Sequence, residues 1–301
     1  MDIAIMIEGQ NGLNWPRWQR IVRAVEDLGF AGLFRSDHVT NPRPPDLDSL
    51  ELWTSLTWAA SNTSRIQFGP LVTPASLHHP VNTARMAAAV DDLSGGRLVL
   101  GLGAGWTERE HANYGFELLD VSPRFRRLEE ALEVITRLLR SDTPSSFEGE
   151  FYRLSEAILL PRPGRPGGPP ILIGGNGTRR TLPLAARFAS EWNAVYVPRE
   201  QYRSLNAKLD ALLEDSGRQP KEVRRSLMTG VVYGKDRRDL ERKLQGRPLE
   251  QLRSRVFVGT GKEIAEQLAE FAQTGASRVM LQWLDLDDID GLNGLAKAVL
   301  P

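Results

Sequence analysis

The chain repeats one pattern eight times: a short apolar segment, then a segment with apolar residues at every third or fourth position. The apolar segments are typical of buried β-strands, and the others of amphipathic helices. Strands that alternate with helices form parallel sheets, so the chain is predicted to be an α/β protein. Eight units in 301 residues predict one (β/α)8 TIM barrel domain over 1–301, with an open doubly wound sheet as the alternative. The predicted strands span 2–8, 30–38, 65–73, 97–103, 170–175, 191–197, 225–234 and 277–283.

Two segments interrupt the alternation and are predicted to be insertions. The first follows the fourth strand and helix, and it combines a small hairpin at 147–154 with a run of prolines and glycines at 161–170. The second, 235–255, follows the seventh strand, is highly charged and is predicted to be helical. The fourth helix is predicted to begin with Ser122 as its N-cap and Pro123 as its first residue.

Composition and short motifs exclude several classes of function. The chain has 38 basic and 38 acidic residues, so no net charge draws it to nucleic acid or to an anionic membrane. It has no cysteine, which excludes disulfides, thiolate metal sites and a cysteine nucleophile. Histidines at metal-binding spacing are also absent, so no metal site is predicted. Without a signal peptide or an apolar run of about 18 residues, the protein is expected in the cytoplasm.

A conspicuous glycine run, GRLVLGLGAGW, spans 96–106. A dinucleotide-binding turn needs glycines at its first, third and sixth positions and an amphipathic helix directly after them. Counting from Gly101, the sixth position is Trp106, and 107–115 has no apolar stripe that would predict a helix. The run is therefore interpreted as the fourth barrel strand, whose glycines allow a neighbouring strand or a ligand to approach closely.

A second glycine-rich turn follows the fifth predicted strand and reads GGNGT. It comprises Gly174, Gly175, Asn176, Gly177 and Thr178, and two arginines follow it. Backbone N–H groups at the start of a helix, close to cationic side chains, form a site for an anion such as phosphate. An ordinary turn before the helix is the alternative.

Several ionisable residues are predicted at the carboxyl ends of the strands, where barrel proteins build their sites. Glu8 ends the first strand, and Asp37 and His38 end the second. Histidine exchanges protons near neutral pH, so His38 is a candidate for proton transfer. Glu8 is a second candidate, or else a structural partner of Arg35. The other histidines, at 78, 79 and 111, fall in the loops after strands three and four. Trp106 and Trp283 follow strands four and eight, where their rings could pack against a planar ligand.

These motifs together resemble the luciferase-like monooxygenase family, which includes bacterial luciferase and relatives that use flavin or deazaflavin. The resemblance rests on FRSDH at 34–38, LSGGRLVLGLGAGW at 93–106, PILIGG at 170–175 and VGTGKEIAEQLAEFAQTGASRVMLQ at 258–282. It implies a barrel that holds FMN or the deazaflavin coenzyme F420 at its mouth. The wording of the SDH and GAGW motifs is most similar to the F420-dependent branch.

The resemblance also implies roles for particular residues. His38, with Asp37 beside it, corresponds to the proton-handling histidine, and the turn after strand five corresponds to the phosphate site. The family has a non-prolyl cis peptide behind the cofactor ring, which would fall at Pro70–Leu71 or Leu71–Val72. Trp106 and Arg109 occupy the places of an acidic and amide pair that some relatives have. The implied cofactor-binding residues are Asp37, His38, Pro70, Leu71, Val72, Thr73, Trp106, Arg109 and residues 174–178.

Three functions follow as hypotheses. The first is an F420-dependent oxidoreductase that transfers a hydride between C5 of the deazaflavin and a small organic substrate, with His38, Asp37 and Glu8 as catalytic residues. The second is a monooxygenase that uses reduced FMN and a separate reductase. The third is a catalytically silent protein that binds flavin or a phosphorylated metabolite. The resemblance further implies a homodimer.

Overall fold

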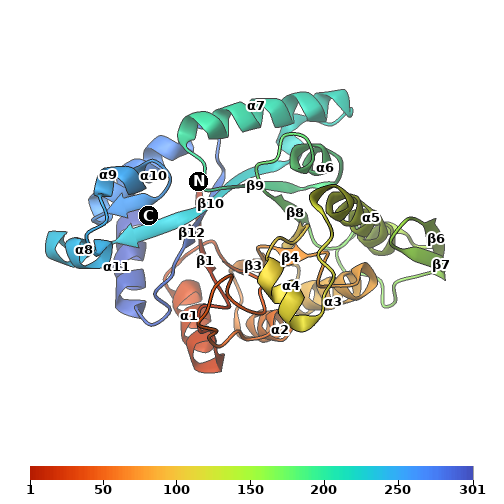
Figure 1. Ribbon diagram of the computed structural model, residues 1–301, viewed down its shortest axis with the longest axis horizontal. Coiled ribbons are helices and arrows are strands. Elements are labelled where there is room, and N and C mark those ends of the chain that lie inside the picture. Colours follow the sequence, from red (N-terminus) through yellow and green to blue (C-terminus); the bar gives the residue numbers. More distant parts are fainter. Residues whose placement is uncertain (301) are drawn as a thin grey trace.

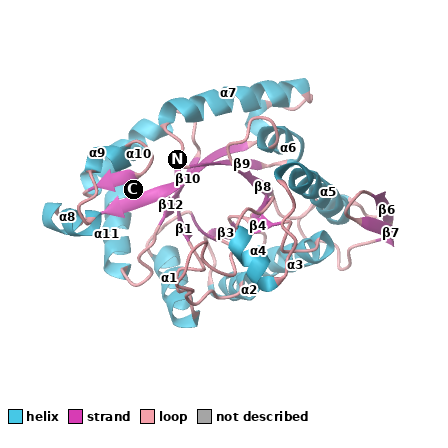
Figure 2. Ribbon diagram, in the orientation of Figure 1, coloured by secondary structure: helices cyan, strands magenta, loops and turns pink. Residues whose placement is uncertain are grey.

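Nine strands form one closed parallel sheet, which stands as an inner ring in Figures 1 and 2. A computed structural model describes residues 1–300, apart from the side chain of Glu250. The neighbour order is β3-β2-β1-β12-β10-β9-β8-β5-β4, and a parallel bridge from Phe68 in β3 to Leu98, just before β5, closes the ring. The barrel prediction is confirmed. The strands are β1 Asp2–Ile7, β2 Gly32–Arg35, β3 Gln67–Pro70, β4 Thr73–Pro74, β5 Leu100–Gly103, β8 Ile171–Gly174, β9 Glu191–Val195, β10 Arg224–Tyr233 and β12 Arg278–Gln282.

The third barrel strand is divided into β3 and β4, and the peptide bond between Leu71 and Val72 is cis. The glycines of the conspicuous run face this irregular strand. A side chain at position 101 would overlap the carbonyl of Pro70, and one at position 103 would overlap Val72. Glycine is therefore required on β5 because the neighbouring backbone lies too close for a Cβ atom.

Eight helices surround the sheet, and each packs an apolar face against it (Figure 2). In α1 (Trp15–Asp27) the residues spaced by three and four, Trp18, Ile21, Val22 and Val25, are buried, and the Asn14 side chain caps the first turn. No helix among residues 1–300 is long and apolar enough to cross a membrane. The other seven helices that surround the sheet are α2 Leu52–Asn62, α3 Pro80–Leu93, α5 Val121–Arg140, α6 Thr181–Phe188, α7 Arg199–Asp215, α10 Gly261–Ala272 and α11 Ile289–Val299.

The first insertion contains the predicted hairpin, formed by antiparallel strands β6 (Ser145–Glu148) and β7 (Arg153–Ala157). The predicted start of the fourth helix is wrong by two residues, because Asp120 rather than Ser122 is the N-cap of α5. Proline is tolerated throughout the first helical turn, where N–H groups have no partner inside the helix. The position of Pro123 therefore did not determine which residue begins α5.

The second insertion is helical as predicted, with α8 (Arg237–Leu244) and α9 (Leu249–Arg253). Directly after this insertion lies a strand that was not predicted, β11 (Phe257–Gly259), which pairs in parallel with the distal end of β10. Leu240, Leu244 and Val258 form a small apolar core here, separate from that of the barrel. The chain also forms a short 3-10 turn at η1 (Pro220–Glu222).

A seven-residue helix, α4 (Glu108–Tyr114), occupies the segment that was predicted to be non-helical. That prediction is wrong because the buried residues of α4 are polar: Glu110 and His111. Their side chains form hydrogen bonds instead of an apolar stripe, so periodicity gives no signal. Thr107 and Glu110 have the spacing of a capping box, which is the signal that could have predicted the helix.

Candidate active site at the barrel mouth

A cavity of about 460 Å³ opens at the carboxyl ends of the barrel strands. One wall is polar and comes from β12, β1 and β2 with the loops that follow them. The rest of the lining comes from the third barrel strand and from β5, β8, β9 and β10 with the residues that follow them. It is mostly apolar or glycine, and Asn193 and Tyr196 are its polar side chains. The lining residues are Met6, Glu8, Gln10, Ser36, His38, Leu71, Val72, Pro74, Gly105, Trp106, Glu110, Gly174, Gly175, Asn193, Val195, Tyr196, Met228 and Gln282.

His38 is held by a carboxylate that the sequence analysis did not identify, that of Glu110 on α4. The Glu110 oxygens lie 3.0 and 3.2 Å from Nδ1 of His38, and one of them also accepts the backbone N–H of Val39 at 3.0 Å. The Glu110 side chain is only 1% exposed. Burial lowers the pKa of His38, but the hydrogen bond and charge of Glu110, with Glu8 and Asp37 farther away, outweigh it and raise that pKa above its ordinary value.

Asp37 does not pair with the adjacent His38. Its carboxylate lies 2.8 Å from Nε2 of His78, in the loop before α3. Consecutive residues of an extended segment point to opposite sides, so the two side chains have different neighbours. Burial lowers the pKa of His78, and the hydrogen bond and charge of Asp37 more than compensate, so this pKa is raised. The pair joins the loop after β2 to the loop after β4.

Glu8 lines the cavity as predicted, but its alternative role as a partner of Arg35 is wrong. Gln282 donates to one Glu8 oxygen at 2.6 Å, and Gln10 donates to the other at 2.9 Å. Arg35 is buried and donates to the Ser55 hydroxyl at 2.7 Å. Glu8 is therefore fixed by two amides from the same polar wall.

Tyr196 extends this network on the far side of Gln282. Its hydroxyl donates to the Gln282 side-chain oxygen, and burial with the nearby charge of Glu8 raises the pKa of Tyr196 to about 12. The backbone of Tyr196 has a φ of 52°, which is uncommon for a residue with a side chain. At the other end, Ser36 donates to Gln10 at 2.7 Å. Five side chains of the mouth therefore form one continuous hydrogen-bonded chain: Tyr196, Gln282, Glu8, Gln10 and Ser36.

The turn after β8 has the features of an anion site. Gly174 and Gly175 line the cavity, and Gly175 has a φ of 124° that only glycine adopts readily. The Asn176 side chain bonds the backbone of Val195 at both its ends, which fixes the shape of the turn. Within the described part of the chain, no acceptor takes the N–H groups of residues 176–178. These donors, directly before α6, fit a phosphate group.

The apolar wall fits the flat ring of a flavin-type cofactor. Leu71 and Val72 line it on either side of the cis bond, and the backbone of Gly105 lines it as well. The side-chain oxygen of Asn193 is buried in the same cavity and has no hydrogen-bond partner in the protein. A buried acceptor without a partner is costly, so this oxygen is suited to an N–H or O–H group of a ligand.

Trp106 lines the cavity at its rim, whereas other predicted residues lie outside it. Trp106 is 61% exposed, and its ring meets the His38 ring edge to face at 5.6 Å. Arg109 turns away from the mouth and binds the carboxylate of Asp46 at 2.6 Å. Trp283 is buried and does not line the cavity, so its predicted place in the wall is wrong. Pro70 and Thr73 flank the lining residues of the third strand without lining the cavity themselves.

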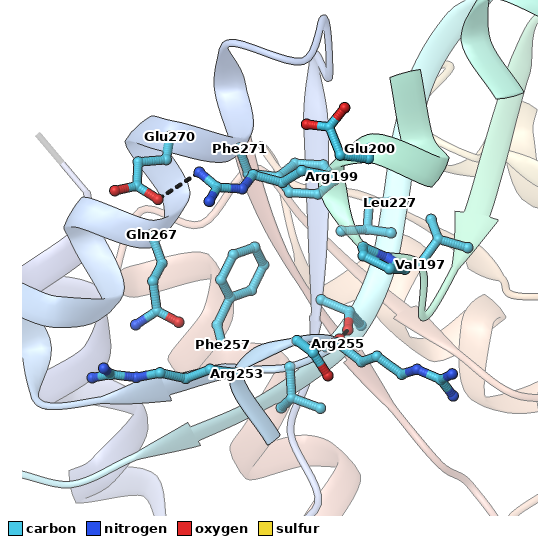
Figure 3. A pocket seen from close by; sticks show the side chains of 14 residues that line it. Val197, Arg199, Glu200, Leu227, Arg253, Arg255, Phe257, Gln267, Glu270 and Phe271 are labelled. Carbon is cyan, nitrogen blue, oxygen red and sulfur yellow. Dashed lines mark hydrogen bonds and ion pairs between the residues drawn. The ribbon is translucent and has the colours of Figure 1, made fainter. Parts of the chain in front are cut away.

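A second hollow lies outside the barrel, between α7, α10 and β10 (Figure 3). Arg199 at its rim is paired with Glu270 at 2.6 Å. Leu227 and Thr229 line this hollow, whereas Met228 between them lines the mouth cavity. Alternate residues of a strand face opposite sides, so the two spaces are separated by β10. None of the predicted site residues lies in this outer hollow.

The fold and the mouth together define a barrel protein whose site is suited to a planar, phosphate-bearing ligand. Residues 1–249 match the family model described as luciferase-like monooxygenase. The chain therefore belongs to the luciferase-like monooxygenase family.

Two relatives illustrate the branch of the family that it resembles. It is 33% identical over 232 residues to a phthiodiolone/phenolphthiodiolone dimycocerosates ketoreductase of Mycobacterium bovis (75% of this chain and 57% of the relative). It is 32% identical over 224 residues to an F420-dependent hydroxymycolic acid dehydrogenase of Mycobacterium tuberculosis (71% and 58%). The chain thus spans less than two thirds of the length of these relatives.

A solved structure shares the whole fold. It is described as an F420-dependent secondary alcohol dehydrogenase in complex with an F420-acetone adduct. The TM-score is 0.86 over 100% of this chain and 99% of the other, at 18% sequence identity. At this identity the likeness shows a common barrel.

Proposed function

We propose that the protein is an F420-dependent oxidoreductase that transfers a hydride between C5 of the deazaflavin and a small organic substrate. The observation that carries the proposal is the His38–Glu110 pair, which faces a cavity bounded by a flat apolar wall and a phosphate-type turn. The two relatives above support it, since one is named as F420-dependent and the other as a ketoreductase. When bound, the deazaflavin supplies the carbon that accepts or donates the hydride.

The residues of the chain have distinct roles in this proposal. The Glu110 carboxylate engages Nδ1 of His38 and leaves Nε2 of the ring to exchange a proton with the substrate oxygen. Glu110 is therefore a positioning residue, and it balances positive charge on the ring when His38 is protonated. Glu8 lies on the polar wall, within the same cavity, where it contributes negative charge. Asp37 acts at a distance, by raising the pKa of His38.

The remaining site residues bind and orient the cofactor. The free N–H groups at 176–178 hold its phosphate, and Leu71 and Val72 support its ring. Burial of the Asn193 oxygen and of the third-strand residues keeps water from the face of the ring. The partners that we propose are small: the organic substrate, a second copy of the chain in a homodimer, and a separate enzyme that recycles the cofactor in the cytoplasm.

The first test compares cofactors. The protein is titrated with F420 and with FMN, and binding is followed by cofactor fluorescence. The proposal expects F420 to bind and to be reduced or oxidised on addition of an alcohol or ketone. Tight binding of FMN without binding of F420 would instead favour the reduced-flavin monooxygenase.

The second test separates catalysis from binding. His38→Ala is expected to bind F420 with an affinity close to that of the wild-type protein and to lose turnover by about 100-fold or more. His79→Ala serves as the control, because the His79 side chain lies outside the cavity. Equal turnover in His38→Ala and wild type would refute the role of His38. Binding of F420 without turnover of any alcohol or ketone by the wild type would favour a silent binding protein.

A further inference from the structure

The charges around the mouth restrict the class of substrate. Building on the proposed function, we propose that the site accepts an uncharged hydroxyl- or carbonyl-bearing molecule with an apolar body, and that it rejects carboxylated and phosphorylated substrates. The inference comes from the charges that line the cavity, from the placement of the nearest cations and from the distribution of apolar side chains.

The polar wall is anionic. Glu8 and Glu110 both line the cavity, whereas the described lining contains neither lysine nor arginine. Positive charge on His38 is matched by Glu110, which lies 3.0 Å from it, so Glu8 keeps the lining negative even when His38 is protonated. The Gln10 and Gln282 amides, which could otherwise donate to an anionic substrate, each donate to Glu8.

Arg124 donates to the carbonyls of Leu119 and Gly105 at the mouth. Two further arginines beside the mouth are also committed to protein groups. Arg35 lies behind Gly9 and directs its guanidinium to the carbonyl of Leu50 and the hydroxyl of Ser55. Arg109 is bound to the carboxylate of Asp46 through both terminal nitrogens. Neither lines the cavity. Once the cofactor phosphate occupies the N–H groups at 176–178, a second anionic group that entered here would lose water without gaining a cationic partner, which is strongly unfavourable.

The remaining surface of the cavity suits a hydrocarbon body. Met6, Met228 and Val195 line it and pack in one apolar cluster with Leu71 and Val72, whose surface we assign to the cofactor ring. At the rim, Trp106 and Leu284 are both more than half exposed, although both are large and apolar. Leu284 follows β12 and Trp106 follows β5, so the two lie at opposite sides of the mouth. They extend the apolar surface beyond the cavity for longer substrates.

The test uses pairs of compounds that differ only in charge: 3-hydroxyalkanoates of four, six and eight carbons and their methyl esters. Binding of each is measured by calorimetry, with and without F420, and kcat/KM is measured with F420. For at least one chain length the ester should be preferred by about 100-fold or more in both Kd and kcat/KM. Calorimetry without F420 is run in excess inorganic phosphate, which occupies the turn at 174–178. The inference is therefore tested even if F420 fails to bind and the proposed function is refuted.

Two variants test whether the charge of Glu8 causes the preference for the ester over the acid. Glu8→Gln should reduce the preference for the ester by about 5-fold or more, because it removes one negative charge from the cavity. Glu108→Gln is the matched control, since Glu108 is exposed on α4 and does not line the cavity, and it should leave the ratio unchanged. Equal or tighter binding of the acids by the wild type overturns the inference. So does binding of neither member of any pair, or an unchanged ratio in Glu8→Gln.

Discussion

Replacing Glu110 by glutamine should reveal how much the mouth depends on one buried carboxylate. Glutamine has nearly the same shape, so Glu110→Gln keeps an acceptor for Val39 N–H but removes the negative charge next to His38. Carboxylates that orient metal-bound histidines typically contribute 10- to 100-fold. We expect an effect of the same size for His38, so kcat/KM should fall by about that factor. The loss of one charge-assisted hydrogen bond should destabilise the fold by about 1.5–3 kcal/mol.

The pH dependence separates a positioning role from general damage. For alcohol oxidation His38 must begin unprotonated, so the rate rises as pH passes through its pKa, which Glu110 raises. In Glu110→Gln the effect of burial prevails, and the rise should move to lower pH. A raised folded-state pKa contributes stability below the unfolded value near 6.5 that is lost as pH rises through the folded value. The variant should therefore be destabilised more at pH 6 than at pH 9.

The assay is initial-rate kinetics of F420 reduction between pH 5 and 9, with thermal unfolding recorded at the same pH values. Each kcal/mol of destabilisation should lower Tm by about 2–4 °C. Glu108→Gln is again the control, and neither its profile nor its Tm should change. A Glu110→Gln profile with the wild-type midpoint, or one moved to higher pH, would refute the role assigned to Glu110.

Three further changes test other parts of the molecule. Gly175→Val should raise the Kd for F420 by about 10-fold or more, because a β-branched residue resists the positive φ of this turn; an unchanged Kd in the fluorescence titration would place the phosphate elsewhere. Glu191→Gln should destabilise the protein by about 3–5 kcal/mol, because the buried Arg278 guanidinium, 3.0 Å from the Glu191 carboxylate, loses its counter-charge. Urea unfolding measures this, and a loss below 1 kcal/mol would contradict it. His78→Gln should lower Tm more at pH 6 than at pH 9. The pKa of His78 is raised beside Asp37, so the ion pair stabilises the fold only while the His78 ring is protonated. An equal effect on Tm at both pH values would argue against that ion pair.

The barrel could be predicted because its units are local. Each strand and helix has its own periodicity, and the parallel crossover rule then leaves few arrangements. The elements that were missed lack such a signal. β11 has only three residues, and α4 buries Glu110 and His111 through hydrogen bonds. The N-cap of α5 was misplaced because Asp120 and Ser122 are both good capping residues.

The positions of the site residues were predicted from the sequence, but their hydrogen-bond partners were not. Glu8, His38 and the glycine turn fall at strand ends, so their places at the mouth followed once the strands were assigned. Their hydrogen-bond partners come from elsewhere in the sequence: Glu110 is 72 residues from His38, and Gln282 is 274 residues from Glu8. No local pattern encodes such pairs. The homodimer, the separate reductase and the cytoplasmic location remain predictions.

The extra strand β11 allows the length of residues 237–253 to vary. Its pairing with the last residues of β10, together with the small core around Leu240 and Val258, forms a unit with its own apolar contacts. Residues 237–253 can therefore lengthen, shorten or open locally without changing the register of the barrel strands. Val256 in this unit packs near Tyr196 and Gly230 at the edge of the mouth. A change at Val256 would thus act on the Tyr196 end of the mouth and would not touch Leu71 and Val72, on the third barrel strand.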